Sequence, residues 1–372
     1  MILGPVKQRQ QILYANQYLL RRLCFSKKKC DKMSEVCLAR QSKLLSEQTG
    51  DPGKNRGINV QTTYDSKHTV EPTLADKGRA ILRLSRWREH VPYTIPAVLV
   101  GAMLAVQNSE SMIDWRIVPV ILANILAMSF AFMINDVEDA PDDALNPKKR
   151  AHNAISSGIL TSQQGWLACL ITFAASFALY AVGGWWTLLW GGLTLLLSYL
   201  YSAYPFRLKA RPLTDVVSHA LMLSGLLVMT GYFTYDHTPG MAWLVILGAT
   251  LFSAYGQFYN QIDDYEVDKA AGLKNTVVLT GKTLTRILMY ASAVGALGSF
   301  LLAVFSGVFP YWLATPALIS IFVAALFVWE TDMRGNNAAG SGAIQKPGLL
   351  VANIIVLMWL AGHLGLLSGI TG

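Results

Sequence analysis

Residues 130–150 read FAFMINDVEDAPDDALNPKKR, and this stretch decides the fold expected of the whole chain. A long apolar run ends in five acidic residues within eight positions, and three consecutive basic residues follow. If the apolar run is a helix that continues, Asn135, Asp139 and Asp143 recur every four residues and share one of its faces. Pro141 favours ending that helix. Acidic residues at membrane depth are costly, so they indicate a function such as cation binding.

The same pattern occurs a second time, in residues 259–268, which read YNQIDDYEVD. Here Asn260, Asp264 and Asp268 again recur every four residues, and each lies 125 positions after its counterpart in the first stretch. Two copies of Asn-x3-Asp-x3-Asp at a constant offset, each closing an apolar helix, indicate an internal repeat. We call residues 135–143 motif one and residues 260–268 motif two.

The composition places the chain in a membrane. Hydrophobic residues make up 53% of the 372 residues and charged residues only 15%. From about residue 91 onward the chain consists mostly of apolar runs of roughly the 20 residues that a membrane-spanning helix needs. The predicted fold is therefore all-α and polytopic, a helical bundle with nine transmembrane helices. The predicted spans are 91–107, 115–134, 165–183, 186–204, 214–235, 241–262, 285–308, 310–330 and 348–369.

The basic residues predict how the chain is oriented. Connections on the side that carries both motifs hold fifteen Lys and Arg, whereas the opposite side holds one, Arg116. The positive-inside rule places both motifs on the cytoplasmic side of a bacterial inner membrane, or on the equivalent face of an organellar membrane. Motif one follows the second span and motif two the sixth, which predicts two four-helix repeats plus one further helix. Topology accounts for the net charge of +8, and nucleic acid is not expected as a partner.

Residues 1–80 are predicted to be a polar, largely disordered tail, and residues 81–372 the transmembrane domain. The tail is compatible with a transit peptide, a basic cytoplasmic tail, or a start placed too far upstream of Met33. Residues 75–90 are predicted to form one basic interfacial helix that leads into the membrane. The four cysteines, at positions 24, 30, 37 and 169, show no metal-ligand spacing and are expected to be free thiols.

Two acidic motifs facing each other across a bundle predict a site for divalent cations. Carboxylate and amide oxygens suit Mg²⁺, which takes part of its shell from substrate phosphates. Basic residues lie nearby in sequence, at 148–150, 207–211 and Lys274. A diphosphate held between metal ions and basic side chains becomes a good leaving group. An apolar cavity in the bundle would accept a hydrocarbon chain and exclude water from a carbocation.

These residues resemble a known family. Motif one, followed by Lys149-Arg150 and Ser156-Ser-Gly158, resembles the first signature of the UbiA superfamily of intramembrane prenyltransferases. Asp264-x-Glu-x-Asp268, continuing through Gly272 and Thr276 to Gly281, resembles the second. The resemblance covers about residues 80–370 and implies nine helices around a central cavity, Mg²⁺ dependence and a prenyl diphosphate donor. Within the superfamily, motif one looks most like members of the lycopene-elongase type, which attach isoprenoid units to carotenoid or other lipid acceptors.

The resemblance also implies roles for individual residues. The expected metal ligands are Asp136, Asp139, Asp143, Asp264 and Asp268. Asp139, Asp264, Arg207 and Lys209 are expected to be catalytic, and the expected substrate-binding residues are Asn135, Arg86, Arg150, Tyr204, Asn260 and Lys274. Many members carry Tyr-x-x-x-Lys after the fourth span, whereas here Tyr204 lies five residues before Lys209, with Arg207 between them.

The predicted function is Mg²⁺-dependent transfer of a prenyl group from an allylic diphosphate to a hydrophobic or aromatic lipid acceptor within the membrane. One alternative is a membrane-bound terpene cyclase, which would ionise the same diphosphate without an acceptor. Another is a transporter of cations or anionic lipids. The predicted topology opposes a transporter, because both repeats run in the same sense and the acids lie at span ends rather than near the midplane.

Overall fold

A computed structural model describes residues 72–367 of the chain, with gaps at 145–146, 271, 316–317, 320–321 and 323–337. For residue 148 and residues 338–348 it describes the backbone alone. The described residues all belong to one compact unit, Glu71–Gly372. Most of the predicted tail and three of the four cysteines lie outside the described residues, so the division at residue 80 stays a prediction. Cys169 is buried and free.

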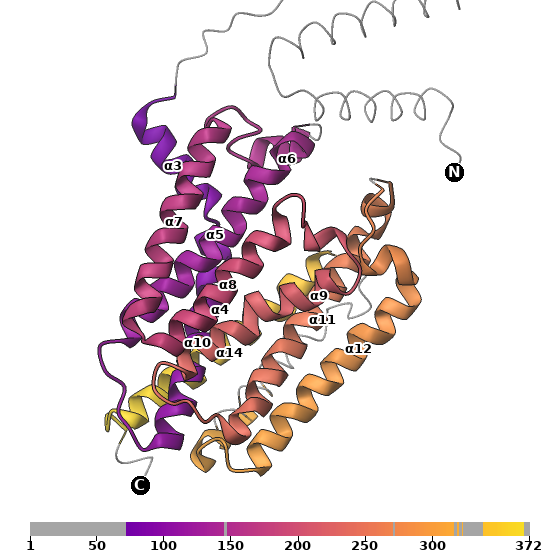
Figure 1. Ribbon diagram of the computed structural model, residues 1–372. Helices are drawn as coiled ribbons and strands as arrows, with labels where there is room; N and C mark the ends of the chain where they lie inside the picture. Colours follow the sequence, from indigo (N-terminus) through magenta and orange to yellow (C-terminus); the bar gives the residue numbers. More distant parts are fainter. Residues whose placement is uncertain are drawn as a thin grey trace, which may run out of the picture. The chain divides into compact units, whose positions relative to one another are not determined.

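The described chain is almost entirely helical, and no strand occurs among these residues (Figure 1). The helices are α3 (Leu74–Leu84), α4 (Trp87–Ser109), α5 (Ile117–Asp143), α6 (Pro147–His152), α7 (Ser162–Val182), α8 (Trp185–Ser202), α9 (Thr214–Ala220), α10 (Leu226–Tyr232), α11 (Trp243–Ala270), α12 (Thr276–Phe305) and α14 (Ala338–His363).

Six helical segments of the described chain are long and apolar enough to cross a membrane. They are Trp87–Ser109, Ile117–Asp143, Ser162–Val182, Thr214–Tyr232, Gly240–Ala270 and Thr276–Phe305. The segment Thr214–Tyr232 consists of α9 and α10, joined without a break by a π-helical turn, Leu221–Gly225. The all-α, polytopic prediction is confirmed at this level. Of the other predicted spans, 186–204 corresponds to α8, 348–369 overlaps α14, and most of 310–330 lies outside the described residues.

The two helices that carry the acidic motifs are longer than predicted. α5 continues through Pro141 to Asp143, because a proline in the last turn removes only one backbone hydrogen bond. α11 likewise continues to Ala270, beyond motif two. Both motifs therefore occupy the final turns of long helices, and the helical spacing expected of them is confirmed.

The prediction of a single helix over residues 75–90 is wrong. The structure has two helices there, α3 and the first turn of α4, separated at Ser85 and Arg86. Arg86 adopts a left-handed backbone conformation, with φ of 47°, which an α-helix cannot continue through. Thr73 and Asp76 form a capping box that defines the start of α3.

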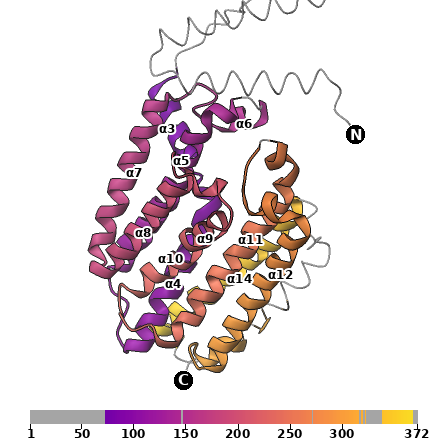
Figure 2. The ribbon, with the colours of Figure 1, turned by 45° about the vertical axis from the view of Figure 1, so that its right-hand side comes forward.

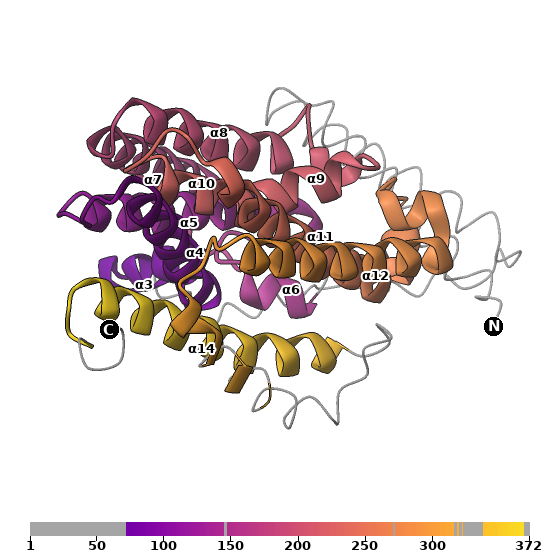
Figure 3. The same ribbon diagram turned by 90° about the horizontal axis from the view of Figure 1, so that it is seen from below.

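Each acidic motif lies on a helix that packs along the next long helix of the chain. α5 packs along α7, and α11 packs along α12 (Figures 1 and 2). α4 and α10 approach very closely because Gly101 faces the Val228 carbonyl and Gly231 faces the Val98 carbonyl, where a methyl group would overlap the backbone. α14 packs against α4 and α11 (Figure 3).

Candidate active site

The loop between α8 and α9, residues 203–213, brings two basic side chains onto motif one; we call it the base loop. The Arg207 guanidinium donates to Asp139 at 3.0 Å and to Asp142 at 3.5 Å. The Lys209 ammonium donates to the other oxygen of Asp139 at 2.6 Å and to the Asn135 side-chain oxygen at 2.7 Å. Both basic side chains are only 14% exposed. Four residues predicted from the sequence therefore meet in one largely buried cluster.

The backbone of the base loop aims these side chains. Arg207 is in the left-handed region, with φ of 39°, and a 3-10 turn over Leu208–Ala210 carries Lys209. The Arg207 guanidinium lies over the Tyr204 ring, 4.8 Å from its centre, which orients it by a cation–π contact. Its Nε is buried and has no hydrogen-bond partner among the described residues. A buried guanidinium N–H without an acceptor is well suited to an anionic ligand.

Burial also changes the pKa of the Lys209 side chain. Desolvation lowers the pKa of its ammonium, since the charged form is disfavoured away from water, and the neighbouring Asp139 carboxylate opposes that shift. The Arg207 charge adds to the lowering.

Asp136 has a different partner from the rest of motif one. It is buried, and the Arg86 guanidinium donates to it at 2.7 Å. Arg86 also lies over the Phe132 ring, 5.6 Å from its centre. Arg86 and Asp136 were assigned to diphosphate and metal from the sequence, and the structure brings them together as an ion pair that joins the α3–α4 turn to α5.

An asparagine binds the last acid of each motif. Asn153 donates from Nδ2 to Asp143 at 2.9 Å and to the Asp136 carbonyl at 2.7 Å. Asn275 donates to Asp268 at 2.6 Å, and its side-chain oxygen caps α12 by accepting from the Val278 N–H. The sequence analysis missed both asparagines. Their signal is an Asn seven to ten residues beyond the last acid of each motif, in the polar connection that precedes the next apolar helix, although motif one is also followed by Asn146.

The two motifs lie at the same end of the helices. The Tyr201 phenol on α8 is within electrostatic range of Asp139 in motif one and Asp268 in motif two. Lys149, which follows motif one, is within electrostatic range of Asp264 and Asp268. Acids and bases from both halves of the chain thus share one region.

Motif two carries fewer contacts than motif one. The Asp264 side chain is exposed and has no hydrogen bond within the described part of the chain. Three more predicted substrate-binding residues, Asn260, Lys274 and Arg150, are exposed as well. Arg150 lines a shallow groove with Ala144, Pro147, Ala151 and Ser157. Among the described residues, no ion pair joins Arg150 to the acids of either motif. These three are therefore not gathered with Asp139.

The carboxylates fit a hard cation only in part. Among the residues that the structure describes, no three His, Cys, Asp or Glu side chains lie close enough together to hold one metal ion. Each motif instead offers acids one helical turn apart, such as Asp139 with Asp143 and Asp264 with Asp268. This donor set fits Mg²⁺, which keeps several waters and binds through one or two carboxylates plus substrate phosphates.

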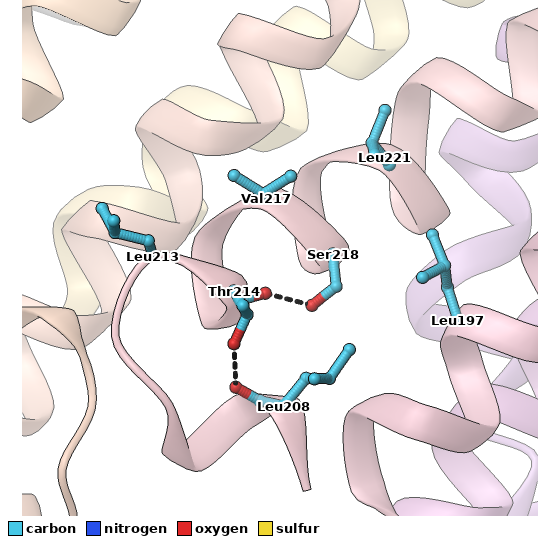
Figure 4. A pocket seen from close by; sticks show the side chains of 7 residues that line it. All are labelled: Leu197, Leu208, Leu213, Thr214, Val217, Ser218 and Leu221. Atoms are coloured by element: carbon cyan, nitrogen blue, oxygen red, sulfur yellow. Dashed lines mark hydrogen bonds between the residues drawn. The ribbon is translucent and has the colours of Figure 1, made fainter. Parts of the chain in front are cut away.

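An apolar groove of about 290 Å³ lies between α8 and α9 and is lined in part by the base loop (Figure 4). Thr214 donates from its hydroxyl to the Leu208 carbonyl at 3.2 Å, which ties the base loop to the start of α9. The groove is lined by Leu197, Leu208, Leu213, Thr214, Val217, Ser218 and Leu221.

The sequence analysis also missed Asp215, on the first turn of α9. It is fully buried and accepts hydrogen bonds from Gln261 and Thr276. The available signal was an acidic residue inside a predicted apolar span, which is rare without a functional or structural partner.

Comparison with known proteins finds relatives over most of the transmembrane region. Residues 94–345, more than half of the chain, match the UbiA prenyltransferase family. A lycopene elongase/hydratase of Haloarcula japonica is 29% identical over 221 residues, which are 55% of this chain and 68% of that protein. A 4-hydroxybenzoate octaprenyltransferase of Pseudomonas aeruginosa is 27% identical over 216 residues, which are 56% of this chain and 68% of that protein.

A solved structure shares the fold. The structure of a UbiA homolog from Archaeoglobus fulgidus, bound to GPP and Mg²⁺, has a TM-score of 0.58 at 21% sequence identity. The likeness covers 77% of this chain and 99% of that one. Together with the family match and the membrane-spanning helices, these findings show that the chain belongs to the UbiA prenyltransferase family and is an integral membrane prenyltransferase.

Proposed function

We propose that this enzyme transfers the prenyl group of an allylic prenyl diphosphate to a hydrophobic lipid acceptor in the membrane, with Mg²⁺ as cofactor. The observation that carries the proposal is the set of contacts between the base loop and motif one. Arg207 and Lys209 surround Asp139, and Arg207 keeps one buried N–H without an acceptor among the described residues. Such a site offers basic groups that can bind an anion, and beside them carboxylates that can bind a cation.

The chain's own residues suggest a division of labour. Arg207 and Lys209 would bind the diphosphate and stabilise the charge that develops on it as the allylic C–O bond breaks. Asp139 and Asp143, with Asp264 and Asp268 from motif two, would hold Mg²⁺, and bound Mg²⁺ would neutralise further negative charge on the departing diphosphate. The acceptor's double bond would supply the electron pair for the new C–C bond, and loss of a proton would restore a neutral product.

The acceptor we propose first is a long polyene of the carotenoid type. The lycopene elongase/hydratase relative and the resemblance of motif one to that branch support it. The second candidate is an aromatic acid, which the 4-hydroxybenzoate octaprenyltransferase relative supports.

The reaction can be tested with detergent-purified protein, allylic diphosphates of several chain lengths, and either a lycopene-type polyene or 4-hydroxybenzoate. We expect product whose mass equals acceptor plus prenyl group minus one proton, and we expect chelation of Mg²⁺ with EDTA to abolish it. Diphosphate release that needs no acceptor would instead indicate the terpene cyclase. Folded protein that releases no diphosphate from any donor would contradict the proposal.

We also propose nine membrane spans in two four-helix repeats plus one, with the active site facing the cytoplasm. Matching helix pairs support the repeat: α5 with α7, and α11 with α12. So do Asn153 and Asn275, each of which binds the last acid of its motif.

The orientation can be tested with single cysteines at exposed positions Lys274 and His237, one beyond motif two and one in the loop before α11, in a background where all four native cysteines are serine. A membrane-impermeant thiol reagent should label His237→Cys, but not Lys274→Cys, in intact cells or in correctly oriented organelles. The reverse labelling would contradict the proposed orientation.

A further inference from the structure

We propose that Asp215 is a positioning residue that fixes the base loop relative to motif two, and so holds Arg207 and Lys209 where the proposed reaction needs them. This inference rests on the proposed function. It concerns a buried acid that neither binds the predicted metal site nor pairs with a basic side chain among the described residues.

The hydrogen bonds of Asp215 define its chemistry. One carboxylate oxygen accepts from the Thr276 N–H at 2.6 Å and from Gln261 Nε2 at 2.7 Å. The other accepts from the Thr276 hydroxyl at 2.5 Å and from the Val216 N–H at 2.8 Å. All four partners are donors, so the site requires an acceptor-only group, which an ionised carboxylate is and an amide is not. The N-terminus of α12 further favours the negative charge.

These contacts join the start of α9, which follows the base loop, to residues at both ends of motif two. Gln261 lies on α11 one turn before Asp264 of motif two. Thr276 follows Asn275, which donates to the last acid of that motif, Asp268, at 2.6 Å. One carboxylate at the start of α9 therefore contacts the helix that carries motif two and the residue next to its asparagine.

Thr276 completes the connection to the base loop. Its hydroxyl accepts from the Leu213 N–H at 2.8 Å while it donates to Asp215. Leu213 ends the base loop with φ of 67° and ψ of −47°, a positive-φ conformation that a leucine adopts only when its surroundings hold it there. On the other side of the loop, Thr214 donates to the Leu208 carbonyl, as Figure 4 shows. The segment that carries Lys209 is thus fixed at its end by Thr276 and Asp215.

The main test uses Thr276→Val, which keeps the side-chain volume and the backbone N–H and removes only the hydroxyl. We expect kcat to fall about tenfold and the inhibition constant of added inorganic diphosphate to rise several-fold, because a small displacement of charged groups weakens binding of the reacting diphosphate. Thr276→Ser, which restores the hydroxyl, should stay within about twofold of the wild type. Asp215→Asn should resemble Thr276→Val or be more severe.

A matched control lies on the same helix. Ser218 is buried on α9, and its hydroxyl donates to the Thr214 carbonyl and has no hydrogen bond to motif two among the described residues. Ser218→Ala should leave kcat and diphosphate inhibition within about twofold of the wild type. If it reproduces the Thr276→Val defect, the effect is a general loosening of α9 and the inference is overturned.

A double-mutant cycle with Lys209→Met separates positioning from an independent structural role. If Thr276 acts through the base loop, adding Thr276→Val to Lys209→Met should cost less than about threefold more in kcat, since the affected group is already gone. Effects that multiply fully, or Thr276→Val kinetics equal to those of Thr276→Ser, would overturn the inference while Lys209→Met stays impaired. A Lys209→Met protein with wild-type kinetics would instead overturn the proposed function itself.

Discussion

Replacing Asp264 with asparagine is expected to reduce prenyl transfer about 10²–10³-fold, the cost of removing one charged group that stabilises a transition state. The amide keeps the shape of the side chain but cannot supply the negative charge that a cation near the diphosphate needs. Because Asp264 is exposed and has no hydrogen bond within the described residues, the thermal stability of the protein should not change. Single-turnover rates with an allylic diphosphate and saturating Mg²⁺ would measure the loss.

The neighbouring acid provides the control. Asp263 is also exposed on α11 but lies outside the four-residue spacing of motif two. Asp263→Asn should remain within about twofold of the wild type, as is usual for surface substitutions away from a site. Equal losses in both variants would mean that the motif contributes only local negative charge, and wild-type rates in Asp264→Asn would remove motif two from the mechanism.

Replacing Lys209 with methionine is expected to affect both activity and stability. The diphosphate loses one of its two buried cations, so the rate should fall about 10²-fold. Asp139 and Asn135 lose hydrogen bonds of 2.6 and 2.7 Å, which should destabilise the protein by about 2 kcal/mol. Arg207 continues to pair with Asp139, which limits the loss. Activity assays and thermal inactivation of detergent-solubilised protein measure the two effects separately.

The two measurements together distinguish the two roles of the lysine. A Lys209→Met protein that is less stable but keeps wild-type activity would mean that Lys209 serves only to neutralise Asp139, and its assignment to the diphosphate would be wrong.

Several features of the site followed from local patterns. Asn135, Asp139 and Asp143 were placed on one helix face by their four-residue spacing, and α5 confirms that face. The membrane-spanning character followed from apolar runs, because a segment that crosses the lipid core must be apolar along its whole length. Both signals depend on residues close together in the chain, and so they can be recognised before any contact is known.

One expectation failed because a backbone conformation intervened. The single helix over 75–90 is broken by the left-handed Arg86, which directs that side chain to Asp136. The substrate-binding roles of Arg150 and Lys274 stay predictions. Both side chains are exposed, and neither forms an ion pair with the cluster at Asp139 among the described residues.

The sequence was sufficient to establish the helical membrane fold, the duplicated acidic motif and the family. The pairing of charges, in contrast, could not be predicted from the sequence. Arg207 and Lys209 reach motif one across 68 to 74 residues, and Asp215 reaches Thr276 across 61. Such contacts depend on how helices pack and on the positive φ angles of Arg207 and Leu213. That is why the buried acid that connects the two halves of the site was found only in the folded chain.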